Sequence, residues 1–277
     1  MILIADSGST KTAWGLWDGG RLVGSVKTAG INPYYQEEAD IATTIGGELV
    51  PALGGVMVDR VYFYGAGCAF EEKNRQVARA INRFIPAPVE VASDLMAAAR
   101  ALCGDRPGIA CILGTGSNSC LYDGRRIVEQ VSPLGFILGD EGSGAVLGKL
   151  FVGDCLKRQL PEALAREFME RYELTPALLL DRVYKRPFPN RFLASLSPFI
   201  HEHLSEPSVY RMVYESFRSF FIRNVRMYTG YQAYEVGFVG SVAYHYQEVL
   251  RAAASSVGVG VGAIMREPMD ALARYHQ

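Results

Sequence analysis

Two short turns rich in glycine and hydroxyl side chains are the clearest chemical signal in the sequence. The first is DSGSTKT at residues 6–12, and the second is GTGSNS at residues 114–119. Each turn lies between two apolar runs, as expected where one strand returns into the next. Glycine allows the backbone to approach a ligand closely, so that successive backbone N–H groups face its phosphate oxygens. Two such turns predict a pair of loops that hold a polyphosphate from both sides.

All seven residues of the first turn and four residues of the second are candidate phosphate-binding residues. They are Asp6, Ser7, Gly8, Ser9, Thr10, Lys11, Thr12, Gly114, Thr115, Gly116 and Ser117. In the first turn we expect the hydroxyl groups to face the ligand together with the backbone N–H groups. Neither turn matches G-x-x-x-x-G-K-[ST] or G-x-G-x-x-G, so a Walker-type loop and a dinucleotide fold are both excluded. One such turn alone is commonly just a turn, and it is the duplication that favours a function.

A third glycine-rich segment, GDEGSG at residues 139–144, leads into a helical stretch that begins at Ala145. A helix N-terminus has unpaired N–H groups and a positive dipole end, which suit an anion or an acid that organises a cation. The alternative is an ordinary helix cap with acidic residues in its first turn. Three glycines exceed what a cap requires, so both interpretations stay open.

Asp94 is the candidate general base. Ser93 and Asp94 follow an apolar run at 89–92 and precede a helical stretch at 95–102, so either residue is also a candidate helix cap. A carboxylate at the carboxyl end of a strand projects into the crevice where α/β sheets bind ligands. There it would accept the proton of a hydroxyl that attacks a phosphoryl group, while Asp6 in the first turn organises a divalent metal ion.

The elements that must position these residues occur twice. Each half of the chain has an apolar run, a polar glycine turn, a second run, an Asp-Gly pair and a third run, which predicts three antiparallel strands. These runs are 2–5, 13–17 and 21–28, and then 109–113, 120–122 and 125–131. A strand, a helix and a strand follow, at 61–64, 71–84 and 89–92, and again at 236–239, 244–254 and 257–261. The sequence predicts a duplicated α/β domain, with mixed sheets flanked by helices and a cleft between the domains.

The second copy is enlarged by an insertion at about 145–230, which the apolar spacing predicts to be helical. Its helices are expected at 145–156, 161–172 and 207–228. The last of these carries an aromatic stripe that we expect to be core, formed by Tyr210, Tyr214, Phe217, Phe221 and Tyr228. We expect an N-terminal domain at 1–105, a C-terminal domain at 106–263, and a C-terminal helix at about 264–277 that packs back on the first domain.

The composition excludes several classes of protein. The 277 residues include 28 Lys plus Arg and 29 Asp plus Glu, and this net charge of −1 argues against a nucleic-acid-binding protein. No apolar run approaches the length of a membrane span, and the first residues do not resemble a signal peptide, so we expect a cytoplasmic protein with no membrane partner. The five cysteines lack zinc-site spacing and are expected to be reduced and mostly buried.

Together these motifs resemble the BadF/BadG/BcrA/BcrD-type ATPase family, and specifically its N-acetylglucosamine kinase branch. The segments that carry the resemblance are DSGSTKT at 6–12, YGAGC at 64–68, Ser93-Asp94, GTGSN at 114–118 and GDEGS at 139–143, in the order seen in that family. The resemblance covers nearly the whole chain. It implies the fold of actin, hexokinase and Hsp70, in which two RNase H-like domains close on ATP.

The resemblance also implies a role for individual residues. The turns at 6–12 and 114–119 look like the two phosphate loops, Gly240-Ser241 falls at the adenosine motif, and Asp94 aligns with the catalytic base. Asp6 would hold Mg²⁺, directly or through water. The residues expected at the sugar are Asn32, Asp94, Thr115, Asn118, Asp140 and Gly144. A sugar needs paired amide and carboxylate contacts to its hydroxyl groups, and four of these residues supply them: Asn32, Asn118, Asp94 and Asp140.

We therefore expect an ATP- and Mg²⁺-dependent kinase that phosphorylates the 6-hydroxyl of N-acetylglucosamine, with glucosamine, glucose and an N-acetylmuramic derivative left open as substrates. One alternative within the family is an ATPase that activates a dehydratase or reductase, which needs cysteines placed to share an iron–sulfur cluster. Another is a sugar sensor without turnover. The helical insertion also offers a surface for a homodimer.

Overall fold

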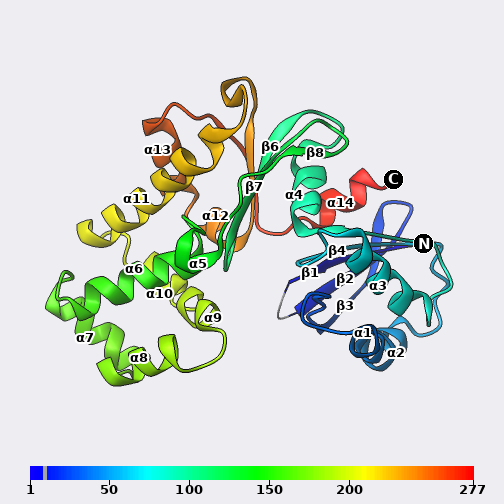
Figure 1. Ribbon diagram of the computed structural model, residues 1–277, viewed down its shortest axis with the longest axis horizontal. Coiled ribbons are helices and arrows are strands. Elements are labelled where there is room, and N and C mark those ends of the chain that lie inside the picture. The colour runs from blue at the N-terminus through cyan, green and yellow to red at the C-terminus, as the bar shows by residue number, and fades with distance from the viewer. Residues whose placement is uncertain (9–10) are drawn as a thin grey trace. The chain divides into compact units, whose positions relative to one another are not determined.

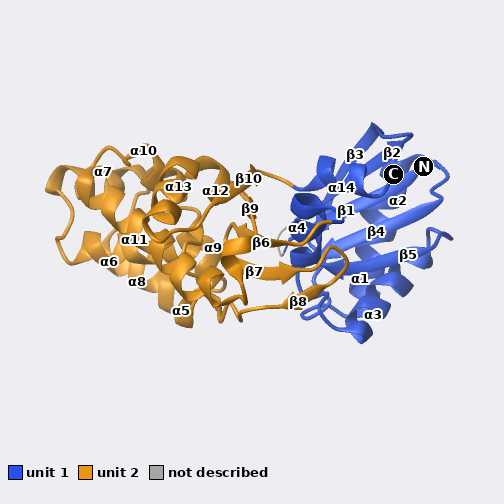
Figure 2. Ribbon diagram, turned by 90° about the horizontal axis from the view of Figure 1, so that it is seen from above, with its two compact units in different colours: residues 1–105, 268–277 blue, residues 106–267 orange. Residues whose placement is uncertain are grey.

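The computed structural model describes residues 1–8 and 11–277, so Ser9 and Thr10 of the first turn lie outside the described residues. The chain divides into two compact units (Figure 2). Unit 1 contains Met1–Asp105 and Pro268–Gln277, and unit 2 contains Arg106–Glu267. Each unit has its own five-stranded sheet and its own hydrophobic core.

The sheet of unit 1 has the strand order β3-β2-β1-β4-β5. Its strands are β1 (Ile2–Ser7), β2 (Lys11–Asp18), β3 (Arg21–Ala29), β4 (Arg60–Gly65) and β5 (Val89–Ser93). Strand β1 pairs antiparallel with β2 and parallel with β4, and β5 continues the parallel part. The sheet is therefore mixed, with an antiparallel hairpin on one side of β1 and two parallel strands on the other.

The sheet of unit 2 repeats this topology with the order β10-β9-β6-β7-β8. Its strands are β6 (Gly108–Leu113), β7 (Ser117–Tyr122), β8 (Ile127–Glu129), β9 (Val236–Val239) and β10 (Val261–Met265) (Figure 1). Strand β6 pairs antiparallel with β7 and parallel with β9, as β1 does with β2 and β4. The prediction of a duplicated α/β fold with mixed sheets is confirmed.

Glycines form the hairpin turns that the sequence predicts. Gly19 and Gly20, which join β2 to β3, have φ values of 50° and 83°, and Gly124 before β8 has a φ of 96°. In the second hairpin Asp123 Oδ1 accepts hydrogen bonds of 2.8 Å from the N–H groups of both Arg125 and Arg126. Positive φ is accessible to glycine without a steric penalty, so these turns form where the glycines lie.

Helices cover both faces of the first sheet. They are α1 (Glu38–Thr44), a π-helical turn (Ile45–Leu49), α2 (Val50–Leu53), α3 (Glu71–Asn82), α4 (Asp94–Cys103) and α14 (Met269–Tyr275). Because side chains alternate along a strand, Leu3 and Ala5 pack in the cluster with α1 and α3, whereas Ile4 packs with α4 and α14. The helix α14 is far along the chain yet contacts α4 and β1.

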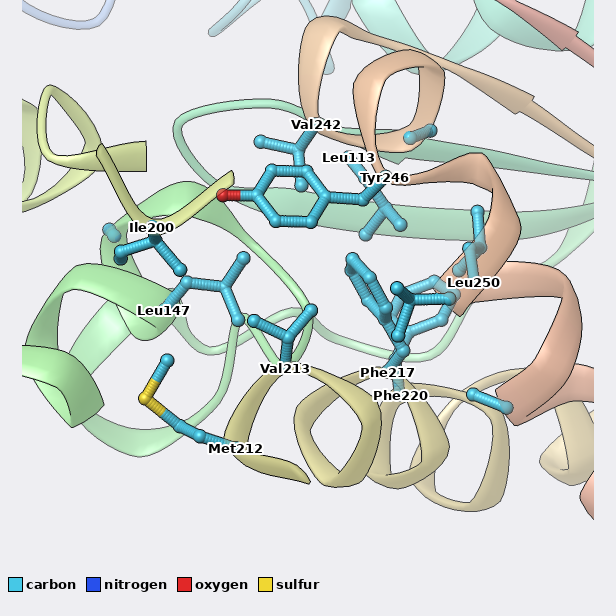
Figure 3. Close-up of a cluster of buried hydrophobic side chains, with 14 of the residues drawn as sticks. Leu113, Leu147, Ile200, Met212, Val213, Phe217, Phe220, Val242, Tyr246 and Leu250 are labelled. Atoms are coloured by element: carbon cyan, nitrogen blue, oxygen red, sulfur yellow. The ribbon is translucent and has the colours of Figure 1, made fainter. Parts of the chain in front are cut away.

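The helices of unit 2 come mostly from the insertion between β8 and β9. They are α5 (Gly135–Leu138), α6 (Gly144–Leu156), α7 (Glu162–Arg171), α8 (Pro176–Tyr184), α9 (Pro189–Ala194), α10 (Ser197–Glu202), α11 (Pro207–Arg223), α12 (Ser241–His245) and α13 (Gln247–Ser256). Figure 3 shows Leu147, Val213, Phe217 and Tyr246 pointing into one apolar cluster. None of the helices within 1–8 and 11–277 is long and apolar enough to cross a membrane.

Three expected boundaries are wrong. The strand expected at 257–261 is β10 at Val261–Met265, because Gly258 has a φ of 73° and the chain turns there after α13 instead of extending. The helix expected at 244–254 is split at Tyr246 into α12 and α13. The helix expected at 207–228 ends at Arg223, and a 3₁₀ turn (Val225–Met227) follows it.

The aromatic stripe of the insertion is core only in part. Phe217, Phe221 and Tyr228 are buried, as expected. Tyr210 is 40% exposed and stacks with Tyr214, their ring centroids 6.2 Å apart. The start of α11 therefore lies at the surface, although the helical spacing continues through it.

Helix α14 is anchored by a histidine that is uncharged in the folded protein. The His276 ring stacks on Tyr62 with centroids 3.5 Å apart, and its Nε2 lies 2.6 Å from the hydroxyl of Tyr64. Arg100 donates to the same hydroxyl at 2.7 Å, so that Tyr64 joins His276 to Arg100. Burial, aided by the positive charge of Arg100, lowers the pKa of His276 to about 4.

Replacing His276 by glutamine should make the free energy of unfolding less dependent on pH in the acid range. As the pH is lowered, the unfolded chain gains a proton on this histidine near pH 6.5, whereas the folded protein does so only near pH 4. The free energy of unfolding therefore decreases as the pH is lowered through that interval. We expect urea denaturation at several pH values to show a shallower fall for His276→Gln than for the wild type. The exposed His245, replaced by glutamine, is the control. Parallel profiles for the wild type and His276→Gln would contradict the prediction.

Candidate functional site

The first phosphate-loop candidate connects β1 to β2. Ser7 lies opposite Thr12 in the antiparallel register, and Gly8 N–H donates to Lys11 O at 3.0 Å. Gly8 and Lys11 are exposed at this turn, and Asp6 lies just before it, partly buried at the end of β1. The turn therefore presents backbone and a lysine to solvent at the carboxyl end of β1.

The hydroxyl groups of Ser7 and Thr12 do not face a ligand, in contrast to the sequence expectation. Both residues are buried, and Ser7 Oγ lies 2.7 Å from Thr12 Oγ1. Ser7 Oγ also donates to Ile31 O at 2.9 Å and accepts from Ile31 N–H at 3.1 Å. These hydroxyl groups hold the turn against the segment after β3, because a buried hydroxyl needs a protein partner. Their contribution to the site is the shape of the loop.

Parallel strands bring three segments to one edge of the first sheet. In the registers of β1, β4 and β5, Ser7 pairs with Gly65 and Gly65 pairs with Ser93. Ala66 N–H donates to Ser7 O at 3.1 Å, which ties the YGAGC turn to the first phosphate-loop candidate. Asp94, the residue after β5, therefore lies at the same edge as the first turn.

Asn32 lies against the YGAGC turn. A Cβ atom added to Gly67, which has a φ of 81°, would lie 2.2 Å from Asn32 Oδ1, so only glycine fits there. The Asn32 N–H donates to Gln36 Oε1 at 2.7 Å, and its Oδ1 accepts from Tyr34 N–H at 3.0 Å. The carbonyl of the amide is therefore fixed by its own loop, and Nδ2 is the group left to face a ligand.

Asp94 is not the cap of α4. The cap is Ser93, whose Oγ accepts from Met96 N–H at 3.1 Å, while Asp94 Oδ1 accepts from Leu95 N–H at 2.8 Å. Burial raises the pKa of Asp94, partly offset by the hydrogen bonds from Leu95 N–H and from its own N–H. Burial and the charge of Asp94 together raise the pKa of the neighbouring Cys68 thiol to about 12. Asp94 is thus a carboxylate of increased basicity that the helix does not need as a cap.

The second phosphate-loop candidate, between β6 and β7, is held by the start of α6. Gly144 N–H donates to Gly114 O at 2.8 Å, and Ala145 N–H donates to Thr115 O at 3.1 Å. The next N–H group, of Val146, donates to Ser143 Oγ at 3.2 Å. Of the two interpretations left open by the sequence, anion binding is wrong for these three N–H groups, and the helix does have an ordinary cap, Ser143. Two of the N–H groups bind the loop and the third binds the cap.

Asp140 lies beside the second turn in a left-handed conformation. Its φ is 52°, and its N–H donates to Pro133 O at 2.9 Å. A Cβ atom added to Gly116 would lie 3.1 Å from Asp140 Oδ2, so the carboxylate is adjacent to the glycine turn. Burial is the largest cause that raises the pKa of Asp140 to about 6, opposed by a hydrogen bond from Ser117 N–H. Asp140 is therefore a buried acid that titrates close to neutral pH.

Asn118 is directed by two hydrogen bonds. Its Oδ1 accepts from Ser119 N–H at 2.9 Å and from Gln130 Nε2 at 3.1 Å. Because the oxygen is occupied, the amide donor Nδ2 is the group available to a hydroxyl oxygen. Ser117 is buried within β7, so its N–H, and not its hydroxyl, contributes to this site.

A cavity of about 360 Å³ opens next to the second turn, entirely within unit 2. Gly114, Thr115 and Gly144 line one side, Ser241 lines another, and α9 and α10 complete the wall. Gly240 has a φ of 128°, and a Cβ atom there would lie 2.2 Å from Leu113 O, so the start of α12 approaches β6 at backbone distance. The structure thereby brings Gly240-Ser241 together with the second turn.

The sequence did not indicate the wall contributed by α9, α10 and the end of α12. Its residues are Ala194, Ser195, Ser197, Pro198, His201, Glu202, Val242, His245 and Tyr246. His201 Nε2 bonds to His245 O at 2.9 Å, and Tyr246 O–H donates to Ser197 O at 2.6 Å. No spacing in the sequence could have revealed a wall assembled from segments that contact each other only in the folded unit. No group of three or more His, Cys, Asp or Glu among the described residues forms a metal site.

Each unit by itself offers groups of the kind that a nucleoside polyphosphate or its magnesium ion requires. The second turn offers glycine backbone beside a cavity, and a Cβ atom at Gly114 would meet nothing within 4 Å, which leaves the loop open to a ligand. Carboxylate oxygen is the ligand type that Mg²⁺ prefers, and Asp6 supplies it beside the first turn. Unit 1 groups Asp6, Asp94 and Asn32, whereas unit 2 groups Asn118, Asp140 and the cavity.

Solved structures resemble the whole chain. A protein from Porphyromonas gingivalis, described as a candidate N-acetylglucosamine kinase, is 51% identical over 100% of this chain and 98% of that chain, with a TM-score of 0.96. A second protein so described, from Chromobacterium violaceum, is 17% identical over 100% and 98%, with a TM-score of 0.73. A ROK hexokinase from Thermus thermophilus is 18% identical over 98% and 97%, with a TM-score of 0.59. The last two show the fold alone. No family model and no curated protein matches the chain.

Two glycines of α6 should respond oppositely to alanine. A Cβ atom at Gly148 would lie 2.1 Å from Leu193 O on α9, whereas a Cβ atom at Gly153 would meet nothing within 4 Å. We expect Gly148→Ala to lower the free energy of unfolding by about 1–3 kcal/mol through overpacking. The matched control Gly153→Ala should raise it by about 0.5–1 kcal/mol, because alanine favours the helix. Chemical denaturation measures both, and equal effects would contradict the assigned contact between α6 and α9.

Replacing Asp140 by asparagine should stabilise the protein above pH 6. The pKa is raised from its ordinary 3.8 to about 6, so the folded state holds a proton that the unfolded state has already lost, and stability falls as pH rises through this interval. Asparagine tolerates the left-handed backbone and carries no charge. We expect Asp140→Asn to gain about 1–2 kcal/mol at pH 7.5 and almost nothing at pH 4. If the difference in the free energy of unfolding between variant and wild type stays constant from pH 4 to pH 7.5, the raised pKa of Asp140 is contradicted.

Proposed function

The chain belongs to the BadF/BadG/BcrA/BcrD-type ATPase family, in its N-acetylglucosamine kinase branch, and we propose that it transfers the γ-phosphate of ATP to the 6-hydroxyl of N-acetylglucosamine or a related amino sugar. Sugar kinases are among the proteins whose structures it resembles. The observation that carries the proposal is the position of Asp94. This acid is released from capping by Ser93 and lies at the same sheet edge as the first phosphate-loop candidate.

The two glycine turns bind the phosphates in this proposal. Lys11 and the backbone N–H groups of Thr115 and Gly116 face the phosphate oxygens, which is the way oriented amides bind anions. The N–H groups of Gly8 and Gly114 close their own turns on Lys11 O and Gly116 O, and Ser117 N–H bonds to Asp140. The cavity beside Gly240-Ser241 takes the adenosine. Mg²⁺ bound with ATP would neutralise phosphate charge, and Asp6 would hold the ion directly or through water.

Amide and carboxylate side chains hold the sugar in this proposal. Asn32 and Asn118 each have a fixed carbonyl, so each offers Nδ2 to a hydroxyl oxygen. Asp140, when ionised, accepts from a sugar hydroxyl, and Gly116 of the second turn lies next to it. Thr115 belongs to the same turn, and Gly144, at the start of α6, holds that turn through Gly114 O. A substrate with several vicinal hydroxyl groups matches this alternation of donors and acceptors.

Asp94 is the proposed general base. As the 6-hydroxyl oxygen forms its bond to the γ-phosphorus and the bond to the β-phosphate oxygen breaks, the hydroxyl proton passes to the Asp94 carboxylate and ADP leaves. The raised pKa of Asp94 makes this carboxylate a stronger base than an exposed aspartate. Closure on the sugar would exclude water and suppress idle hydrolysis.

The cysteines do not favour the activator alternative. A cluster shared between two subunits requires cysteines at a surface, yet Cys111 in β6 and Cys120 in β7 are fully buried within the second sheet. Cys68 and Cys155 are buried as well. Iron content and colour of the purified protein would separate the two functions directly.

Asp94→Asn should remove phosphotransfer while ATP still binds. Loss of a general base lowers kcat by about 10²–10⁴-fold, and the nucleotide contacts proposed here do not involve Asp94. A coupled ADP assay with N-acetylglucosamine measures turnover, and calorimetry measures ATP affinity. Ser93→Ala is the neighbouring control, expected to lose about 1 kcal/mol of stability with its cap but to retain turnover. Full turnover by Asp94→Asn would eliminate Asp94 as the base.

The same assay across a panel of sugars tests the substrate class. We expect ATP turnover to depend on sugar and to be highest with N-acetylglucosamine among glucosamine, glucose and an N-acetylmuramic derivative. Rapid ATP hydrolysis that does not change with any of the sugars would contradict the kinase proposal and indicate an ATPase.

A further inference from the structure

The segment that carries Asp140 is held from behind by helix α11. Gly142 N–H donates to Ser216 Oγ at 3.1 Å, and this bond is buried. Glu141 pairs with Arg223 and accepts a hydrogen bond of 3.3 Å from Asn224 Nδ2. The partners come from near the middle and from the end of α11, so two successive residues after Asp140 are tied to one helix of the insertion.

The backbone of this segment needs such support. Asp140 and Gly142 have φ values of 52° and 74°, and the left-handed region is unfavourable for an aspartate unless its surroundings impose it. A Cβ atom on Gly142 would lie 3.1 Å from Phe217 Cδ1 and 3.4 Å from Phe220 Cβ, so the segment is pressed against α11. Phe217 and Phe220 belong to the apolar cluster of Figure 3. The conformation of Asp140 therefore depends on α11 as much as on its own sequence.

Ser216 is placed to act on Asp140 through one peptide group. Its side chain is 6% exposed, and its hydroxyl accepts the N–H two residues after Asp140. Asp140 O in turn accepts from Ser143 N–H at 3.0 Å, so residues 140–143 form a closed turn between α5 and α6. A displacement at Gly142 is thereby transmitted to the position of the Asp140 carboxylate beside Gly116.

We propose that Ser216 is a positioning residue for sugar binding, which fixes the Asp140 carboxylate through its hydrogen bond to the Gly142 N–H. The inference rests on the proposed sugar kinase function, and it gives the helical insertion a role in substrate affinity. The second phosphate-loop candidate is held by α6, through Gly144 and Ala145, and not by Ser216. Asp140 adds one contact to this loop, from Ser117 N–H, whereas the two bonds from α6 do not involve Ser216. The effect of Ser216 is therefore expected to be much larger on the sugar than on the nucleotide.

Steady-state kinetics of Ser216→Ala separate positioning from a purely structural role. Alanine leaves the buried Gly142 N–H without its acceptor, so the segment that carries Asp140 is no longer held in place. We expect KM for N-acetylglucosamine to rise about tenfold or more while KM for ATP changes less than about twofold. Ser216→Thr retains the hydroxyl and should restore most of the sugar affinity. Ser219→Ala, one turn further along α11, is the matched control and should leave both KM values unchanged.

The outcomes are distinguishable. An active wild type with an unchanged sugar KM in a folded Ser216→Ala protein overturns the positioning role and leaves the kinase function standing. Equal rises in the sugar and ATP KM values also overturn it, because they indicate a general loss of structure. Should Ser216→Ala fail to fold, Ser216→Cys, whose thiol is a weaker acceptor, provides the same comparison. A wild type that phosphorylates no sugar overturns the proposed function itself.

Discussion

The start of helix α6 is the contact on which the candidate site residues of unit 2 depend. The first two N–H groups of this helix are used by the carbonyls of Gly114 and Thr115, at 2.8 and 3.1 Å. A helix start is otherwise left with unpaired donors, and here those donors shape a loop. The contact is possible because Gly144 and Gly148 carry no side chains where α6 meets the loop and α9. Close backbone packing thus fixes the positions of both the second turn and one wall of the cavity.

The candidate site residues of unit 1 depend on parallel strand register instead. Parallel strands end at the same edge of a sheet, so Ser7, Gly65 and Ser93 become neighbours although they are far apart in sequence. The antiparallel hairpin on the other side of β1 returns the first turn to the same edge. The duplicated topology repeats this geometry in unit 2, with the turn between β6 and β7 next to the end of β9. The same strand order therefore places a polar edge in each of the two sheets.

The charged groups of the candidate site are a few buried acids, and burying them lowers the stability of the protein. The net charge of −1 does not conflict with a polyphosphate ligand, because backbone N–H groups and a divalent ion neutralise phosphates without a basic surface. Asp94 and Asp140 both have raised pKa values because burial disfavours their charged forms. Natural proteins tolerate such destabilising groups where a reaction or a ligand requires them. The hydroxyls of Ser7, Thr12 and Ser119, by contrast, are internal structural groups.

The sequence alone determined the glycine turns, the two hairpins and the duplication, because positive φ and strand alternation depend on residues that are adjacent in the chain. It also indicated Asp94 and Asp140 as acids at the ends of elements. It could not predict the hydrogen bond of Ser7 to Ile31 or that of Gly142 to Ser216, since these bonds join residues that are 24 and 74 positions apart. For the same reason it left open whether the first N–H groups of α6 are free, and it missed the cavity wall at α9 and α10. Local conformation follows from neighbouring residues, whereas the partner of a buried polar group is decided only when distant segments pack together.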